Sequence, residues 1–158
     1  MNYFRQNDEN CFRLSKSQSL IFEKASLNRI PSYFFVKVFF NSKYGRQFDD
    51  LSILYSPRNE QQIYLETEKK VKMRRGSIIP APVMAWIGYL LREWSYLYAM
   101  PSTALLKIVS LDYLAGVYNP YHSQDIRKAI ELILKDKKVD LDPIPLNRTI
   151  KILQEITA

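Results

Sequence analysis

Apolar residues recur at spacings of three and four along most of the chain, a periodicity that predicts helices. The pattern is strongest between residues 81 and 100. Two adjoining apolar stripes run there: Met84, Ile87, Leu91, Trp94 and Tyr98, and beside them Val83, Trp86, Leu90 and Leu97. A helix that is apolar over more than half of its circumference is contacted on several sides. The pattern therefore predicts a central helix over about 83–98, with Arg92 and Glu93 on its narrow polar face.

Shorter amphipathic stretches precede and follow this helix. Ser56, Ser110 and Ser123 are expected to begin three of the helices, because a hydroxyl side chain can accept hydrogen bonds from free N–H groups at a helix start. The aromatic run 118–122 is expected to be a turn. The prediction is an all-α, compact, single-domain bundle of six to eight helices. Its divisions are a flexible segment over 1–14, a helical domain over 15–138, and a Pro-containing linker with a C-terminal helix over 139–158.

Residues 33–40, with the sequence YFFVKVFF, leave the type of element open. Their β-propensity is high, which suits a buried strand. A helix would place Phe35, Val38 and Phe39 on one stripe, and Pro31 would suit its first turn. We favour the helix because no second strand of comparable strength lies nearby to pair with it.

The composition restricts the chemistry. The 158 residues include only four Gly, and no phosphate-binding glycine motif is present. With one Cys (Cys11) and one His (His122), the chain can form neither an internal disulfide nor a zinc site of the Cys/His type. We expect no metal and no cofactor. The absence of a signal pattern and of an 18-residue apolar stretch leads us to expect a cytoplasmic protein that does not enter a membrane.

Candidate catalytic groups are few. The neighbouring acids at 49–50, 66/68 and 140/142 are interpreted as surface charges, because adjacent carboxylates on a helix point apart. A general base needs a nucleophile and an orienting partner within hydrogen-bond reach. His122 has Ser123 and Asp125 nearby, but both are better explained by the start of the next helix. We therefore expect no catalysis, and keep an enzyme built around His122 as the last alternative.

Positive charge is concentrated in the first half of the chain. Residues 1–79 contain 14 of the 23 Lys and Arg but only 8 of the 16 Asp and Glu. The densest group consists of Lys69, Lys70, Lys72, Arg74 and Arg75. One interpretation is a solvated helix end, which cations stabilise through the helix dipole. The alternative is a nucleic-acid-binding regulator that uses this group for phosphate contacts.

The predicted central helix carries more aromatic residues than a single-sided core can bury, unless the helix is contacted on several sides. The chain contains 11 Tyr, 8 Phe and 2 Trp, and Trp, Tyr and Arg are the residues that protein interfaces favour. The C-terminal helix is a second candidate contact, because an apolar helix behind a linker can enter a partner's groove. The residues expected to bind a partner are Trp86, Tyr89, Arg92, Trp94, Tyr96, Tyr118, Tyr121, His122, Ile150 and Leu153.

The run from Met84 to Tyr98 resembles a motif, W-I-G-Y-x-Y-R-Y-x-x-Y, of small bacterial proteins of the antitoxin type from toxin–antitoxin modules. The likeness extends to 35–43, 48–50, 105–108 and 118–131, and so covers roughly 17–134. This chain has Leu91-Arg92-Glu93 where the motif has Tyr-Arg-Tyr. The resemblance implies a protein that neutralises a cognate toxin by occluding it. Self-association remains a further possibility, and nucleic acid is the weaker alternative partner.

Overall fold

The computed structural model describes residues 3–71 and 73–143, and this part of the chain contains helices and no strand. The all-α prediction is confirmed. The elements are α1 (Tyr3–Leu27), α2 (Ser32–Asn41), α3 (Lys43–Asp49), the 3₁₀ helix η1 (Ser52–Tyr55), α4 (Glu60–Val71), α5 (Ala81–Tyr98), α6 (Ser102–Ile108), α7 (Leu111–Tyr121) and α8 (Ile126–Asp136).

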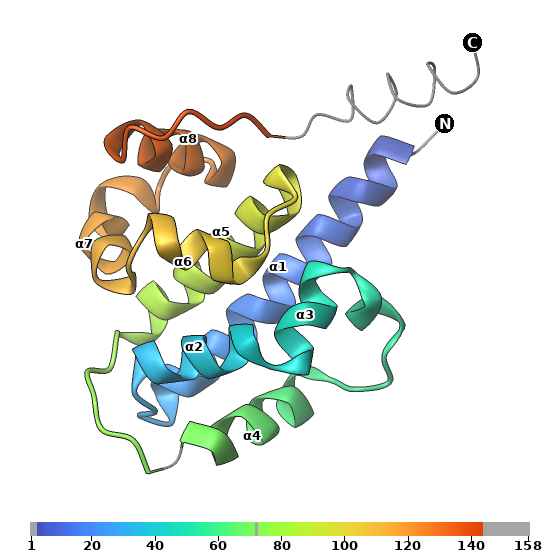
Figure 1. Ribbon diagram of the computed structural model, residues 1–158, viewed down its shortest axis with the longest axis vertical. Coiled ribbons are helices and arrows are strands. Elements are labelled where there is room, and N and C mark those ends of the chain that lie inside the picture. Colours follow the sequence, from blue (N-terminus) through green and yellow to red (C-terminus); the bar gives the residue numbers. More distant parts are fainter. Residues whose placement is uncertain (1–2, 72, 144–158) are drawn as a thin grey trace.

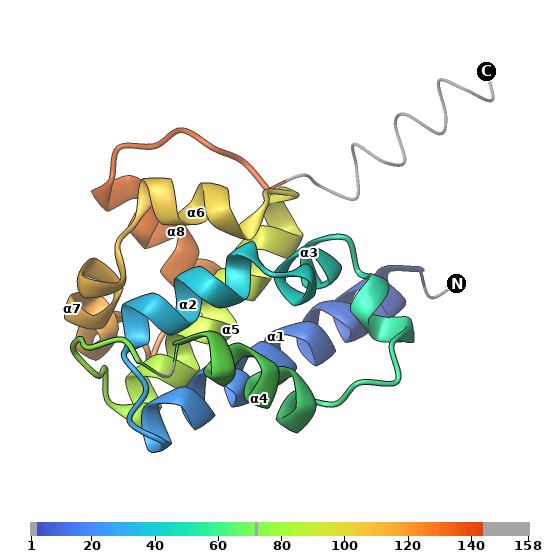
Figure 2. The same cartoon turned by 60° about the horizontal axis from the view of Figure 1, so that its bottom comes forward.

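Helix α5 is central, as predicted, and packs against α1, α6, α7 and α8 (Figure 1). Helices α1 and α4 lie on one side of it and α6 and α8 on the other (Figure 2). Its closest neighbour is α1, and Gly88 permits that approach. A Cβ at Gly88 would lie 3.0 Å from the Gln18 carbonyl oxygen and 3.0 Å from the Phe22 ring. Because Gly88 has no side chain, the backbone of α5 can pack directly against the Phe22 ring of α1. These are the two longest helices among the described residues.

Residues 33–40 form helix α2, which confirms the favoured alternative. Phe35 and Phe39 face inward and meet the Phe22 ring edge-on, with centroids 6.2 and 5.6 Å away. Tyr33 and Lys37 point outward. The high β-propensity of the segment thus reflects its large rings, which here fill the space between α1 and α2.

The N-terminal prediction is wrong. Helix α1 begins at Tyr3, where a flexible segment was expected over 1–14, and Cys11 and Leu14 are buried. The buried stripe of α1 has helical spacing but includes polar members, and this mixture conceals its period. Its residues are Cys11, Leu14, Ser15, Gln18, Ile21, Phe22 and Ala25.

Three helix boundaries also differ from expectation. Helix α4 begins after Asn59, whose side chain and that of Gln62 accept hydrogen bonds from each other's backbone N–H groups, both at 2.9 Å. Helix α7 continues through Pro120, so 118–121 is helical, while Ser110 caps it as predicted. Asp125, and not Ser123, caps α8. Residues 139–143 are not helical, and the predicted C-terminal helix with Ile150 and Leu153 lies outside the described residues.

Candidate functional site

The predicted partner-binding residues of α5 divide into two groups. Trp86, Tyr89 and Tyr96 are half-buried, so each lies at the border between the buried and the exposed sides of α5. Arg92 and Trp94 are fully buried, so their assignment to a partner surface is wrong. Only the first group is placed to meet another molecule.

Three rings form a continuous row across α5 and α7. Trp86 contacts Tyr118 edge-on, with ring centroids 5.7 Å apart. Tyr118 stacks on His122 at 4.2 Å and an angle of 15°. The spacing of four residues between Tyr118 and His122 places both on one helix face. The row runs from half-buried Trp86 to exposed His122.

A second aromatic pair adjoins this row. Tyr89 lies one helical turn after Trp86 on α5 and meets Phe12 of α1 edge-on at 6.5 Å. The Phe12 side chain is 52% exposed, and the Lys16 ammonium lies 5.8 Å from its ring centre. We call the set of Phe12, Trp86, Tyr89, Tyr118 and His122 the aromatic surface. Phe12 was not predicted, because it falls in the segment expected to be flexible.

The His122 imidazole is fixed by the end of its own helix. Its Nδ1 lies 2.7 Å from the Tyr118 carbonyl oxygen and 3.2 Å from that of Asn119, which requires the proton on Nδ1. The hydrogen bonds of Asp125 go to the α8 backbone instead. The histidine is thus held for stacking and presents its outer edge to solvent.

Tyr121 belongs to a different arrangement. Its hydroxyl donates to Asp136 at 2.5 Å, and the Tyr113 hydroxyl donates to the same oxygen at 2.9 Å. These two hydrogen bonds lower the pKa of Asp136, and the bond to the carboxylate raises the pKa of Tyr121. The arrangement ties α7 to α8, and Tyr121 is no part of the aromatic surface.

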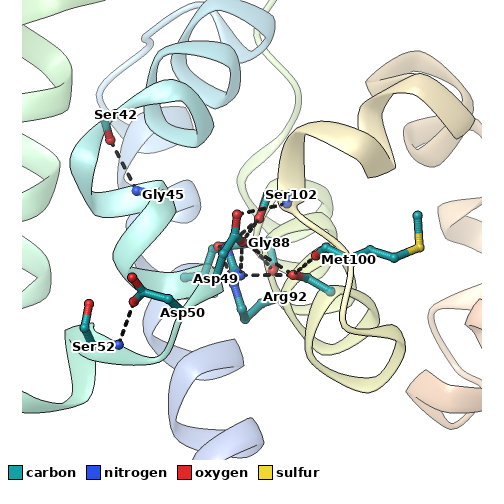
Figure 3. A network of polar contacts seen from close by, with 11 residues as sticks. Ser42, Gly45, Asp49, Asp50, Ser52, Gly88, Arg92, Met100 and Ser102 are labelled. Atoms are coloured by element: carbon teal, nitrogen blue, oxygen red, sulfur yellow. Dashed lines mark hydrogen bonds and ion pairs between the residues drawn. The ribbon is translucent and has the colours of Figure 1, made fainter. Parts of the chain in front are cut away.

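Arg92 lies at the centre of a buried polar network, shown in Figure 3. Its Nε and Nη2 donate to Gln18 at 3.0 and 2.8 Å. Its Nη1 donates to Asp49 at 2.7 Å and to Ser95 at 3.3 Å, and Nη2 donates to Ser102 at 2.7 Å. These five hydrogen bonds match the five N–H groups of a guanidinium. The network links α1, α3, α5 and α6.

The network corrects the interpretation of Asp49 as a surface charge. Its carboxylate accepts from the Ser102 hydroxyl at 2.5 Å and from the Ser102 backbone N–H at 3.1 Å, as well as from Arg92. Burial lowers the pKa of Arg92, while the Asp49 charge opposes that shift. Because the guanidinium has partners on all sides, the arrangement is suited to holding helices together.

Glu93 was also expected on an exposed face and is buried. Its Oε1 lies 3.8 Å from the Cys11 sulfur and 3.9 Å from Arg127 Nε. Burial, followed by the Glu93 charge, raises the pKa of Cys11 from 9.0 to about 12. The thiol is therefore protonated at neutral pH.

Cys11 is expected to react slowly with thiol reagents in the folded protein, because the thiolate is the reactive form and the residue is buried. At pH 8, its modification by a chromogenic disulfide should be at least about 100-fold slower than in urea-unfolded protein. The raised pKa of Cys11 also makes the stability of the folded protein depend on pH. The stabilising contribution is complete below pH 9.0 and is lost as the pH rises toward about 12. Equal rates in folded and unfolded protein would contradict the buried position.

The predicted basic cluster is exposed at the end of α4 and in the connection that follows. Lys69 and Lys70 lie in the last turn of α4, and Arg74 and Arg75 come three and four residues after its end. Lys72 lies outside the described residues. The Arg74 guanidinium lies 5.4 Å from the Phe34 ring centre, a contact that the sequence did not reveal.

A metal site and a membrane-spanning helix are the remaining candidate features in the part of the chain that the structure describes. No group of three or more His, Cys, Asp or Glu there is arranged to hold a metal ion. None of the described helices has the length and apolar content needed to cross a membrane. In comparisons with known proteins, no family model, no curated protein and no solved structure gives a match.

Proposed function

We propose that this protein binds a partner protein through the aromatic surface and, in doing so, acts as an antitoxin that occludes a toxin. The observation that supports the proposal is two neighbouring sets of ring contacts, Trp86–Tyr118–His122 and Tyr89–Phe12, which join α5 to α7 and to α1. Aromatic rings that are partly packed in the free protein lose little side-chain entropy on binding, and they dominate the energy of many interfaces.

The antitoxin assignment rests on where the resembling motifs lie in the fold. Four members of the aromatic surface, Trp86, Tyr89, Tyr118 and His122, belong to the two runs that resemble antitoxin-type proteins. Other residues of the same runs, such as Gly88 and Arg92, hold the core together. The resembling runs thus contain both the packing between helices and the rings that remain available for contact. Occlusion of a toxin requires such a surface and no reaction by this chain.

The experiment is co-expression with the protein encoded by the neighbouring gene. We expect the two proteins to co-purify, and we expect the neighbour to be toxic only when it is expressed alone. The double variant Trp86→Ala/Tyr118→Ala should weaken binding at least about 100-fold, since two interface hot spots contribute roughly 2 kcal/mol each. Growth inhibition should then return.

The matched control is Tyr55→Ala, which removes a tyrosine that is 90% exposed on η1. It should leave binding and growth unchanged. If the two proteins neither co-purify nor differ in toxicity when separated, the antitoxin proposal fails. If they bind but the double variant binds equally well, the aromatic surface is the wrong surface. Concentration-dependent self-association that the double variant abolishes would assign the surface to a second copy of this chain.

A further inference from the structure

A second surface alternates rings and cations on the outer side of α2. Tyr33 is 55% exposed and meets Phe34 edge-on at 5.5 Å. The Lys37 ammonium lies 5.8 Å from the Tyr33 ring centre, and the Arg74 guanidinium lies 5.4 Å from that of Phe34. We call these four residues the cation–ring surface. It shares no residue with the aromatic surface of the proposed function.

A cavity of about 320 Å³ opens beside the two rings. Tyr33 and Phe34 line it from α2, Gly76 and Ser77 from the α4–α5 connection, and Ser110 and Asp112 from the start of α7. The lining therefore combines two aromatic residues with serines and one aspartate, and apolar residues complete it: Pro31, Ile79, Leu106, Val109 and Leu111. A space of this size accepts a planar heterocycle, which can stack on the exposed Tyr33 ring while Phe34 meets that ring edge-on.

The charges around the cavity differ in sign. Arg74 and Arg75 are exposed just before Gly76, and Lys69 and Lys70 lie one turn earlier. Among the described side chains, no ion pair involves any of these four cations. Asp112 lines the cavity and is exposed, and a carboxylate there can accept hydrogen bonds from amino or imino N–H groups. The site thus offers cations to a phosphate and an acceptor to a base.

We infer that this cavity binds a nucleoside phosphate, with the base against Tyr33 and Phe34 and the phosphate toward Arg74 and Arg75. The base would donate to Asp112. The same chemistry is presented by a free nucleotide and by one unit of a single-stranded nucleic acid. Duplex nucleic acid does not fit, because its bases are stacked within the helix and cannot enter the cavity.

The test measures binding by the full chain, using calorimetry with the four 5′-mononucleotides and anisotropy with labelled 12-nucleotide RNA and DNA single strands. A matched duplex serves as the competitor. If the protein binds both mononucleotides and single strands, the cavity recognises a single nucleotide unit. If the protein binds single strands but no mononucleotide, the ligand is single-stranded nucleic acid, and neighbouring phosphates contribute to the affinity.

Three variants identify the site. Tyr33→Ala should weaken binding at least about fivefold through lost stacking. Arg74→Ala should reduce the slope of log affinity against log salt by about one. Asp112→Asn should alter the preference among bases while leaving the salt slope unchanged. Lys43→Ala, which removes an exposed cation on α3, is the charge-matched control and should have no such effects.

Three results would overturn the inference. The first is no binding of any mononucleotide at 1 mM (about the weakest affinity of interest) together with no binding of either strand. The second is an equal loss of affinity in Lys43→Ala and Arg74→Ala, which would indicate attraction by net charge alone. The third is equal binding of the duplex or of polyglutamate, which would assign the cations to a different class of partner. Circular dichroism of each variant verifies its folding, and since Tyr33 and Arg74 are exposed, both variants should fold.

Discussion

Arg92→Ala should lower the free energy of unfolding by about 3–5 kcal/mol, because it leaves a partly buried carboxylate without its cation. Asp49 is only 20% exposed, and Gln18, Ser95 and Ser102 would also lose a hydrogen-bond partner. Unsatisfied buried groups each carry a desolvation cost. Small domains have a total stability of only about 5–15 kcal/mol, so the variant should be close to unfolding.

Urea denaturation followed by circular dichroism measures the effect. The control is Arg75→Ala, an exposed arginine whose loss should change stability by no more than about 0.5 kcal/mol. A double-mutant cycle with Asp49→Ala adds a second check. The double variant should lose less than the sum of the single losses, since each single change already breaks the shared ion pair. A loss below about 1 kcal/mol in Arg92→Ala would show that the network contributes little.

The Arg92 network also shows what a sequence cannot supply. Periodicity placed Arg92 on the narrow polar face of α5, but this face is buried in the fold. What covers that side depends on Gln18, Asp49 and Ser102, which lie 74, 43 and 10 residues away. Each is an ordinary polar residue in its local pattern. Only the tertiary fold brings them to one point, so burial of the arginine could not be anticipated.

Apolar spacing, by contrast, does predict helices when the stripe is purely hydrophobic. This held for α5 and for α8, where four residues of the stripe are buried (Ala129, Ile130, Ile133 and Leu134) and the fifth, Ile126, is half-buried. It failed for the first part of α1, where Ser15 and Gln18 interrupt the stripe. That error concealed Phe12, and with it one edge of the aromatic surface. Trp86, Tyr118 and His122 were predicted as contact residues, although their arrangement in one row follows only from the packing of α5 on α7.

The two tryptophans of the chain should lose different amounts of stability on truncation. Trp94 is fully buried, and Trp94→Ala should lower the free energy of unfolding by about 3–5 kcal/mol through the cavity that it leaves. Its indole N–H has no hydrogen-bond partner among the described residues, so Trp94→Phe should be tolerated far better. Trp86 is half-buried, and Trp86→Ala should cost only about 1–2 kcal/mol.

Fluorescence separates the two positions without relying on stability. In Trp94→Phe the remaining Trp86 should be quenched by acrylamide more strongly than Trp94 is in Trp86→Phe, since only Trp86 reaches the surface. If the aromatic surface binds a partner, adding that partner should protect Trp86 and leave the quenching of Trp94 unchanged. Equal quenching of both residues in the free protein would contradict the positions described for them. An interface that covers Trp86 must exclude acrylamide from this residue. If a partner binds but protects neither tryptophan from quenching, the contact therefore lies elsewhere on the molecule.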